Sequence, residues 1–242
     1  MTGVAEDSTQ RVRPDLPPAE RAGPGGGEPP SQPGGRPSAP GALGRIQAFV
    51  NTIDLEGGVD ELDDPAALRA WLAANDLPGG NACVTRDDLS RALAVREALR
   101  EVLAGNAGHG IDRLAIATLD AVAVATPLVV RFAPDGRATL APQGGGVDAA
   151  LGRLLADVAA SVLDGSWARL KVCRNDACRW AFYDSSKNRS GAWCTMAVCG
   201  NRMKGRRYRR RARATAERDG SAAGRPQRRL QPTARDAHDP NM

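Results

Sequence analysis

After the N-terminal tail, apolar residues first recur at the spacing of an α-helix. The first apolar set is Ile46, Phe49, Val50 and Ile53. Residues three and four positions apart lie on one face of a helix, so this set predicts a short amphipathic helix. The pair Gly57-Gly58 is expected to end it.

Three more helices are predicted from capping residues and apolar stripes. Asp64 stands before Pro65, which suits the first position of a helix. Thr85 is followed three residues later by Asp88, an acidic variant of the capping box, and a long apolar stripe follows. Residues 111–125 predict the next helix.

The pattern then changes to a period of two. Residues 128–132 and 137–140 read as strands, and Pro134-Asp135-Gly136 between them is a turn sequence, so a β-hairpin is expected. Asp148 is expected to cap a last helix that ends at Gly165.

Composition indicates where the ordered part begins and ends. Residues 1–40 contain 9 Pro and 7 Gly and almost no branched aliphatic residues, so the segment 1–42 is predicted to be disordered. The polar end, 215–242, is predicted to be disordered as well. Between them we expect an α+β arrangement: a helix-rich domain with one β-hairpin at 43–168, and a small module with a basic helix at 169–214.

Charge is divided unevenly along the chain. The whole sequence has 33 Lys or Arg against 28 Asp or Glu, a net charge of +5. From Lys171 to Thr215 there are 13 against 2, a net of +11, so the remainder carries −6. This asymmetry indicates that one end of the protein faces a polyanion.

The expected cellular location follows from the lack of a membrane-spanning run, the lack of a secretory signal and the number of cysteines. The chain has no run approaching the ~18 apolar residues that a membrane-spanning helix needs, and the N-terminal MTGVAEDSTQ lacks the apolar stretch of a secretory signal. Five cysteines in such a chain point to a reducing compartment, where clustered cysteines usually hold metal. A cytoplasmic protein without a membrane partner is therefore expected.

Four of the five cysteines lie within 27 residues. They form two pairs with four intervening residues each, Cys173 with Cys178 and Cys194 with Cys199. Two short cysteine loops from separate pieces of chain supply the tetrahedron of thiolates that zinc prefers. Two disulfides, or unrelated buried thiols, are the alternative, which a reducing compartment disfavours. Four thiolates close the coordination shell, so one structural zinc is expected rather than a catalytic one.

The spacing also predicts the architecture of this module. The first cysteine loop is expected at the end of a strand, and the second is expected to lead into a helix. Between them, residues 180–183 and 191–193 can pair as a hairpin, which gives a treble-clef-like finger. The sequence has no phosphate-binding loop, catalytic triad or open metal site, so an enzyme is not expected. Cys83 stands alone and is expected to be a small buried apolar residue.

This region resembles the CGNR zinc finger family, named for the run that is Cys199-Gly200-Asn201-Arg202 here. The other matching positions are Asn175, Phe182, Asp184, Arg189 and Lys204. The N-terminal part resembles the ABATE domain that usually precedes this finger, through Phe49-Val50-Asn51-Thr52, Leu55-Glu56, Trp71-Leu72 and the helix after Thr85. The resemblance implies a bacterial, stress-induced transcription regulator whose finger binds DNA.

An arginine-rich run, NRMKGRRYRRRARA, follows Cys199. Its charge density predicts salt-sensitive affinity for nucleic acid. The residues expected to contact nucleic acid are Arg189, Asn201, Arg202, Lys204, Arg206, Arg207, Tyr208, Arg209 and Arg210. Asn201 and Arg202 are the candidates for reading bases, because Asn can read adenine and Arg guanine. The alternative is that Asn201 braces the backbone and Arg202 pairs with Asp184.

Three functions remain open at this point. The first is a DNA-binding regulator whose N-terminal domain binds an effector or forms a homodimer. The second is an RNA-binding or ribosome-associated module in which Trp180, Tyr183 or Trp193 stacks on bases. The third is a protein–protein adaptor with purely structural zinc. In each case we expect chelation to unfold residues 171–212 and to leave the first domain folded.

Overall fold

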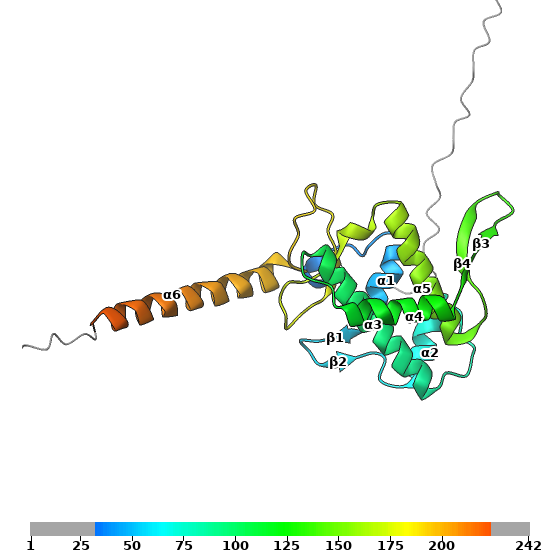
Figure 1. Cartoon of the computed structure of the whole chain (residues 1–242), viewed down its shortest axis with the longest axis horizontal. Coiled ribbons are helices and arrows are strands. Elements are labelled where there is room, and N and C mark those ends of the chain that lie inside the picture. Colours follow the sequence, from blue (N-terminus) through cyan, green and yellow to red (C-terminus); the bar gives the residue numbers. More distant parts are fainter. Residues whose placement is uncertain (1–31, 224–242) are drawn as a thin grey trace, which may run out of the picture.

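The computed structural model describes residues 32–223, with side chains as far as Thr215. Within this part of the chain, five α-helices form the body, and a sixth α-helix, α6 (Asn201–Ala223), extends away from it (Figure 1). Small antiparallel ribbons complete the fold, which confirms the predicted α+β class. Residues 1–31 and 224–242, which belong to the predicted tails, lie outside the described residues.

The body is built from helices whose apolar faces meet in one core. They are α1 (Ala42–Val50), α2 (Pro65–Ala74), α3 (Arg86–Asn106), α4 (Arg113–Ala125) and α5 (Gly146–Leu163). Ile46 and Phe49 of α1, Leu99 and Leu103 of α3, and Leu154 of α5 have no exposed surface. Each such side chain contributes about 1.5–3 kcal/mol by leaving water. Among the described residues, no helix is both long enough and apolar enough to cross a bilayer.

Two helices begin where their caps predict. The Asp64 carboxylate accepts the N–H of Ala67 at 2.7 Å. Thr85 and Asp88 exchange hydrogen bonds between side chain and backbone, at 2.8 and 3.2 Å, so the capping box is formed. The prediction for α5 was wrong, because its N-cap is Gly145. Asp148 lies in the first turn instead, where a carboxylate stabilises the helix dipole.

Ribbons form both where the sequence predicts them and where it does not. The predicted hairpin consists of β3 (Leu128–Phe132) and β4 (Ala138–Pro142). An unpredicted ribbon, β1 (Ile53–Asp54) with β2 (Val59–Asp60), follows α1 directly. Ile53 therefore belongs to a strand and not to the first helix, which ends at Val50.

A third ribbon contradicts the hairpin predicted inside the finger. Strand β5 (Leu170–Val172) pairs with β6 (Ala181–Tyr183), and residues 191–193 form no strand. The first cysteine loop serves as the turn of this hairpin, because the Cys173 N–H donates to the carbonyl of Trp180 at 2.9 Å. All three residues of β5 are buried, and pairing with β6 satisfies their backbone groups away from water.

The cysteine module and the helical body share one core. Leu170, Val172 and Ala181 are buried in the same apolar cluster as the residues of α1 and α3. The Asn51 amide also pairs with the backbone of Ala181, donating to its carbonyl at 2.9 Å and accepting from its N–H at 2.8 Å. The predicted boundary at residue 168 therefore separates segments of sequence and not separate cores.

The segment 32–42 is ordered, although its composition predicts disorder. The guanidinium of Arg36 donates to the carbonyls of Tyr183 and Trp193, at 3.4 and 3.3 Å. It also lies 5.0 Å from the centre of the Phe182 ring, within the range of a cation–π contact. The N-terminal segment thus crosses the cysteine module before it enters α1.

Candidate metal centre and nucleic-acid interface

The four clustered cysteines bring their sulfur atoms together. The Sγ atoms of Cys173, Cys178, Cys194 and Cys199 all lie within 4.8 Å of one another, and all four residues are buried. Cys194 Sγ is 3.7 Å from Cys178 Sγ and 3.6 Å from Cys199 Sγ. Zinc–sulfur bonds of about 2.3 Å in a tetrahedron give sulfur–sulfur distances of about 3.8 Å. The donor set and its spacing therefore fit one zinc ion.

Backbone hydrogen bonds hold the two cysteine loops in shape. In the first loop, the carbonyl of Asn175 accepts the N–H groups of Cys178 and Arg179, at 2.8 and 3.0 Å. In the second loop, a π-helical turn, Met196–Gly200, carries Cys199 and continues directly into α6. The metal site thus fixes the point at which the basic helix leaves the body.

The thiols of this cluster influence one another strongly. Hydrogen bonds from Cys178 and Cys194 lower the pKa of Cys173 to about 2. Contact with Cys173 and Cys178 raises the pKa of Cys194 far above its ordinary value. A bound dication stabilises all four thiolates, which makes the zinc structural and fills the coordination shell.

Asn175 links the metal site to the basic helix. Its side-chain amide donates to Cys199 Sγ at 3.7 Å, and its side-chain oxygen accepts from Arg206 at 3.3 Å. Asn175 is 1% exposed, so the contact with Arg206 joins a buried amide to a residue on the surface. Outer partners of this kind orient the ligands of a metal.

Asp184 organises the loop between the two cysteine pairs. Its carboxylate accepts from Lys171 Nζ at 2.8 Å, from Ser186 and from the Gly191 N–H at 2.7 Å. Burial raises the pKa of Asp184, but these hydrogen bonds outweigh it and lower the pKa to about 2. A Cβ on Gly191 would lie 2.8 Å from the carboxylate carbon, so any larger residue there would force the hydrogen-bonded carboxylate to move.

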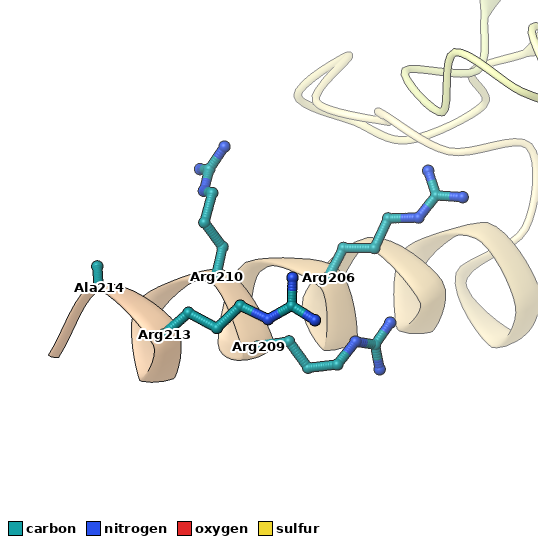
Figure 2. Close-up of a pocket in the computed structure, with 5 residues that line it drawn as sticks. All are labelled: Arg206, Arg209, Arg210, Arg213 and Ala214. Atoms are coloured by element: carbon teal, nitrogen blue, oxygen red, sulfur yellow. The ribbon is translucent and has the colours of Figure 1, made fainter. Parts of the chain in front are cut away.

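The basic helix presents its cations to solvent. Arg206, Arg209, Arg210 and Arg213 line an open groove along α6, together with Ala214 (Figure 2). The predicted contact residues Lys204, Arg207 and Tyr208 also lie exposed on α6, and Tyr208 is 75% exposed. Arg189 lies apart from them, in the exposed loop after β6, where its carbonyl accepts a hydrogen bond from Lys171.

The two candidates for base reading have partners within the protein. The Asn201 amide donates to the carbonyl of Ala197 at 3.1 Å, which is the bracing contact considered as its alternative role. Arg202 forms an ion pair with Glu56, in the turn between β1 and β2, and not with Asp184. Glu56 was not expected at this site, because 146 positions of sequence separate it from Arg202.

The aromatic residues proposed to stack on RNA have structural roles. Trp180 and Trp193 pack against the cysteine cluster, and Tyr183 packs against the main core. Cys83 is exposed, which corrects the expectation that it is a buried apolar residue.

Two family models match this chain. The ABATE family, described as "Putative stress-induced transcription regulator", matches residues 44–165, just over half of the 242 residues. The CGNR zinc finger matches residues 169–212 and contains all four clustered cysteines. A search of curated proteins found no match.

Proposed function

Because this chain belongs to the ABATE family and carries a CGNR zinc finger, we propose that it is a DNA-binding transcription regulator in which structural zinc fixes the start of an arginine-rich helix. The coordination shell of four thiolates supports a binding function and not a catalytic one. The cytoplasmic location predicted from the sequence belongs to the same proposal, since a bacterial regulator of this kind acts beside the chromosome.

The proposal rests on the basic residues of α6, most of which have no carboxylate partner among the described side chains. Eight basic residues lie between Arg202 and Arg213. Among the described side chains, Arg202 alone of these eight has a carboxylate partner. Unpaired cations at this density are stabilised by phosphates, whose binding releases condensed counterions.

The distribution of these cations around the helix favours binding in the major groove of DNA. Arg206, Arg209 and Arg213 follow one face of α6, and Arg207 and Arg211 follow a neighbouring one. The major groove of DNA admits an α-helix and has phosphates along both of its walls. A helix with cations on several faces can contact both walls at once.

The aromatic residues favour DNA over RNA. Recognition of single-stranded RNA relies on exposed aromatic side chains that stack on bases. Trp180 and Trp193 pack against the metal site and are only partly exposed, so they offer less surface for stacking than a freely exposed ring does. Tyr208 is the aromatic residue of α6, and a single exposed tyrosine suits a contact with the sugar-phosphate backbone.

The test compares nucleic acids that bind the full-length, zinc-loaded protein. We expect fluorescence anisotropy to show binding to a DNA duplex of about two helical turns, with a strong decrease in affinity as salt rises. A structured RNA should compete less well than unlabelled duplex. Replacing Arg206, Arg209, Arg210 and Arg213 together by Gln should abolish binding.

Arg131 provides the matched control, because it is an exposed arginine of β3 with no ion pair among the described side chains. Arg131→Gln removes one positive charge far from α6 in the sequence and should leave the affinity unchanged. If RNA competes as well as DNA, or if the fourfold variant binds normally, the proposal is wrong.

A further inference from the structure

Among the basic residues of α6 whose side chains the structure describes, Arg202 alone is paired with a carboxylate. Its guanidinium pairs with Glu56, which the β1–β2 turn of the ABATE domain presents. Both side chains are partly exposed, at 48% for Arg202 and 40% for Glu56. The pair is therefore open to solvent and to any anion that approaches the start of the helix.

The turn that carries Glu56 is held in one shape. The carboxylate of Asp54 accepts the N–H groups of Glu56 and Gly57, each at 3.0 Å. At the base of the ribbon, Asp60 pairs with Arg96 of α3 through two hydrogen bonds of 2.7 and 2.8 Å. Arg96 is 3% exposed, so the ribbon is anchored in the body and Glu56 is presented from a fixed support.

We propose that Glu56 is an internal competitor for nucleic acid: it holds Arg202 in the free protein and lowers the affinity of the finger for phosphates. This inference rests on the proposed function. Carboxylate and phosphate bind a guanidinium in the same forked geometry, so both cannot take the same donors of Arg202. Nucleic acid must displace Glu56 before it gains this contact.

The exchange has a consequence for the salt dependence of binding. An unpaired arginine that binds a phosphate adds about 0.9 to the slope of log affinity against log salt. Arg202 leaves one anion to bind another, and the released Glu56 carboxylate then stands close to the polyanion. In the wild-type protein, Arg202 should therefore contribute less than one full contact to the slope.

The experiment measures duplex DNA binding by the full chain for Glu56→Gln, Arg202→Gln and the double variant. An exposed ion pair is worth little, so we expect Glu56→Gln to tighten binding by about 2- to 5-fold at low salt. The slope should become steeper by up to about 0.9. Arg202→Gln should weaken binding more in the Glu56→Gln background than in the wild type.

The control is Glu61→Gln, which removes the same charge just after β2. The Glu61 carboxylate has no ion pair among the described side chains. If Glu61→Gln tightens binding as much as Glu56→Gln, the effect is general electrostatics and the competition is refuted. Zinc content and melting temperature should be equal in all variants, since all three substituted positions are exposed.

Other results would distinguish failure of this inference from failure of the proposed function. If Glu56→Gln weakens binding, Glu56 positions Arg202 for nucleic acid and does not compete with it. If its affinity and slope equal those of the wild type, the inference alone fails. If the zinc-loaded wild type binds no duplex even at low salt, the proposed function fails as well.

Discussion

Four hydrogen bonds converge on the carboxylate of Asp184, one from Lys171, two from Ser186 and one from Gly191. Asp184 and Lys171 are both buried, at 1% and 5% exposed. Each charge therefore stabilises the other, because a buried ammonium without its carboxylate partner would have no interaction to offset its desolvation free energy. This pair, close to the metal site in sequence, ties β5 to the loop that follows β6.

Asp184→Asn should consequently destabilise the protein strongly. The amide is neutral and turns an N–H₂ group toward one of the donors, so Lys171 remains as an unpaired buried charge. We expect a loss of about 3–5 kcal/mol in the free energy of unfolding, measured by urea denaturation at pH 7. Asp63→Asn, an exposed carboxylate, should cost less than about 0.5 kcal/mol.

The pH dependence of this contribution follows from the depressed pKa of Asp184. A carboxylate with a lowered pKa stabilises the folded state above its unfolded pKa of about 3.9. The contribution is lost as the pH falls through that range toward about 2, the value in the folded state. A loss of only a few tenths of a kcal/mol in Asp184→Asn at pH 7 would contradict this account.

At the scale of elements, the sequence predicts those features that depend on residues close together in the chain. The capping residues Asp64 and Thr85 act within one helical turn, so the starts of α2 and α3 are predictable. The ribbon β1–β2 has strands of two residues, and its support comes from Arg96, 36 positions away from Asp60. No short-range pattern reveals such a contact.

The candidate site divides in the same way. The cysteine ligands are predictable because each pair lies within one short loop, and the basic helix is predictable from its charge. The partners that orient this helix are not predictable. Glu56 meets Arg202, and Arg36 meets Phe182, only because the folded body brings distant segments together.

Binding of nucleic acid should stabilise the exposed helix α6 along its length. Arginines three and four residues apart, such as Arg206, Arg209, Arg210 and Arg213, repel one another by about 0.2–0.5 kcal/mol per pair. Beyond its first turns α6 has no described side-chain contact with the body to offset this repulsion. Duplex DNA should therefore slow hydrogen exchange at residues 204–215 at least 10-fold. The amides of α3 should not change, and equal protection in both helices would contradict a local effect.

At the scale of the whole molecule, zinc stabilises more than the finger. Leu170 and Val172 lie three and one residues before Cys173, and Ala181 follows Cys178 by three residues. These side chains belong to the core formed by α1 and α3. The Asn51 amide and the Arg100 guanidinium also bind backbone carbonyls of β6 and of the cysteine loop, at 2.9 and 3.1 Å. Loss of the metal must therefore weaken the body, in contrast to the independent unfolding that the sequence predicts.

Removal of zinc should lower the stability of the whole described fold in one transition. If β5 and β6 detach, the exposure of Leu170 and Val172 alone costs about 3–6 kcal/mol. We expect chelation, or Cys199→Ser, to increase hydrogen exchange in α1 and α3 together with the finger. The matched control is Cys83→Ser, which removes an exposed thiol outside the cluster and should retain both zinc and stability. Unchanged protection of α1 and α3 in a chelated protein whose finger exchanges freely would show that the domains fold separately. The shared core would then contribute little, because the body would retain its stability after β5 and β6 had left it.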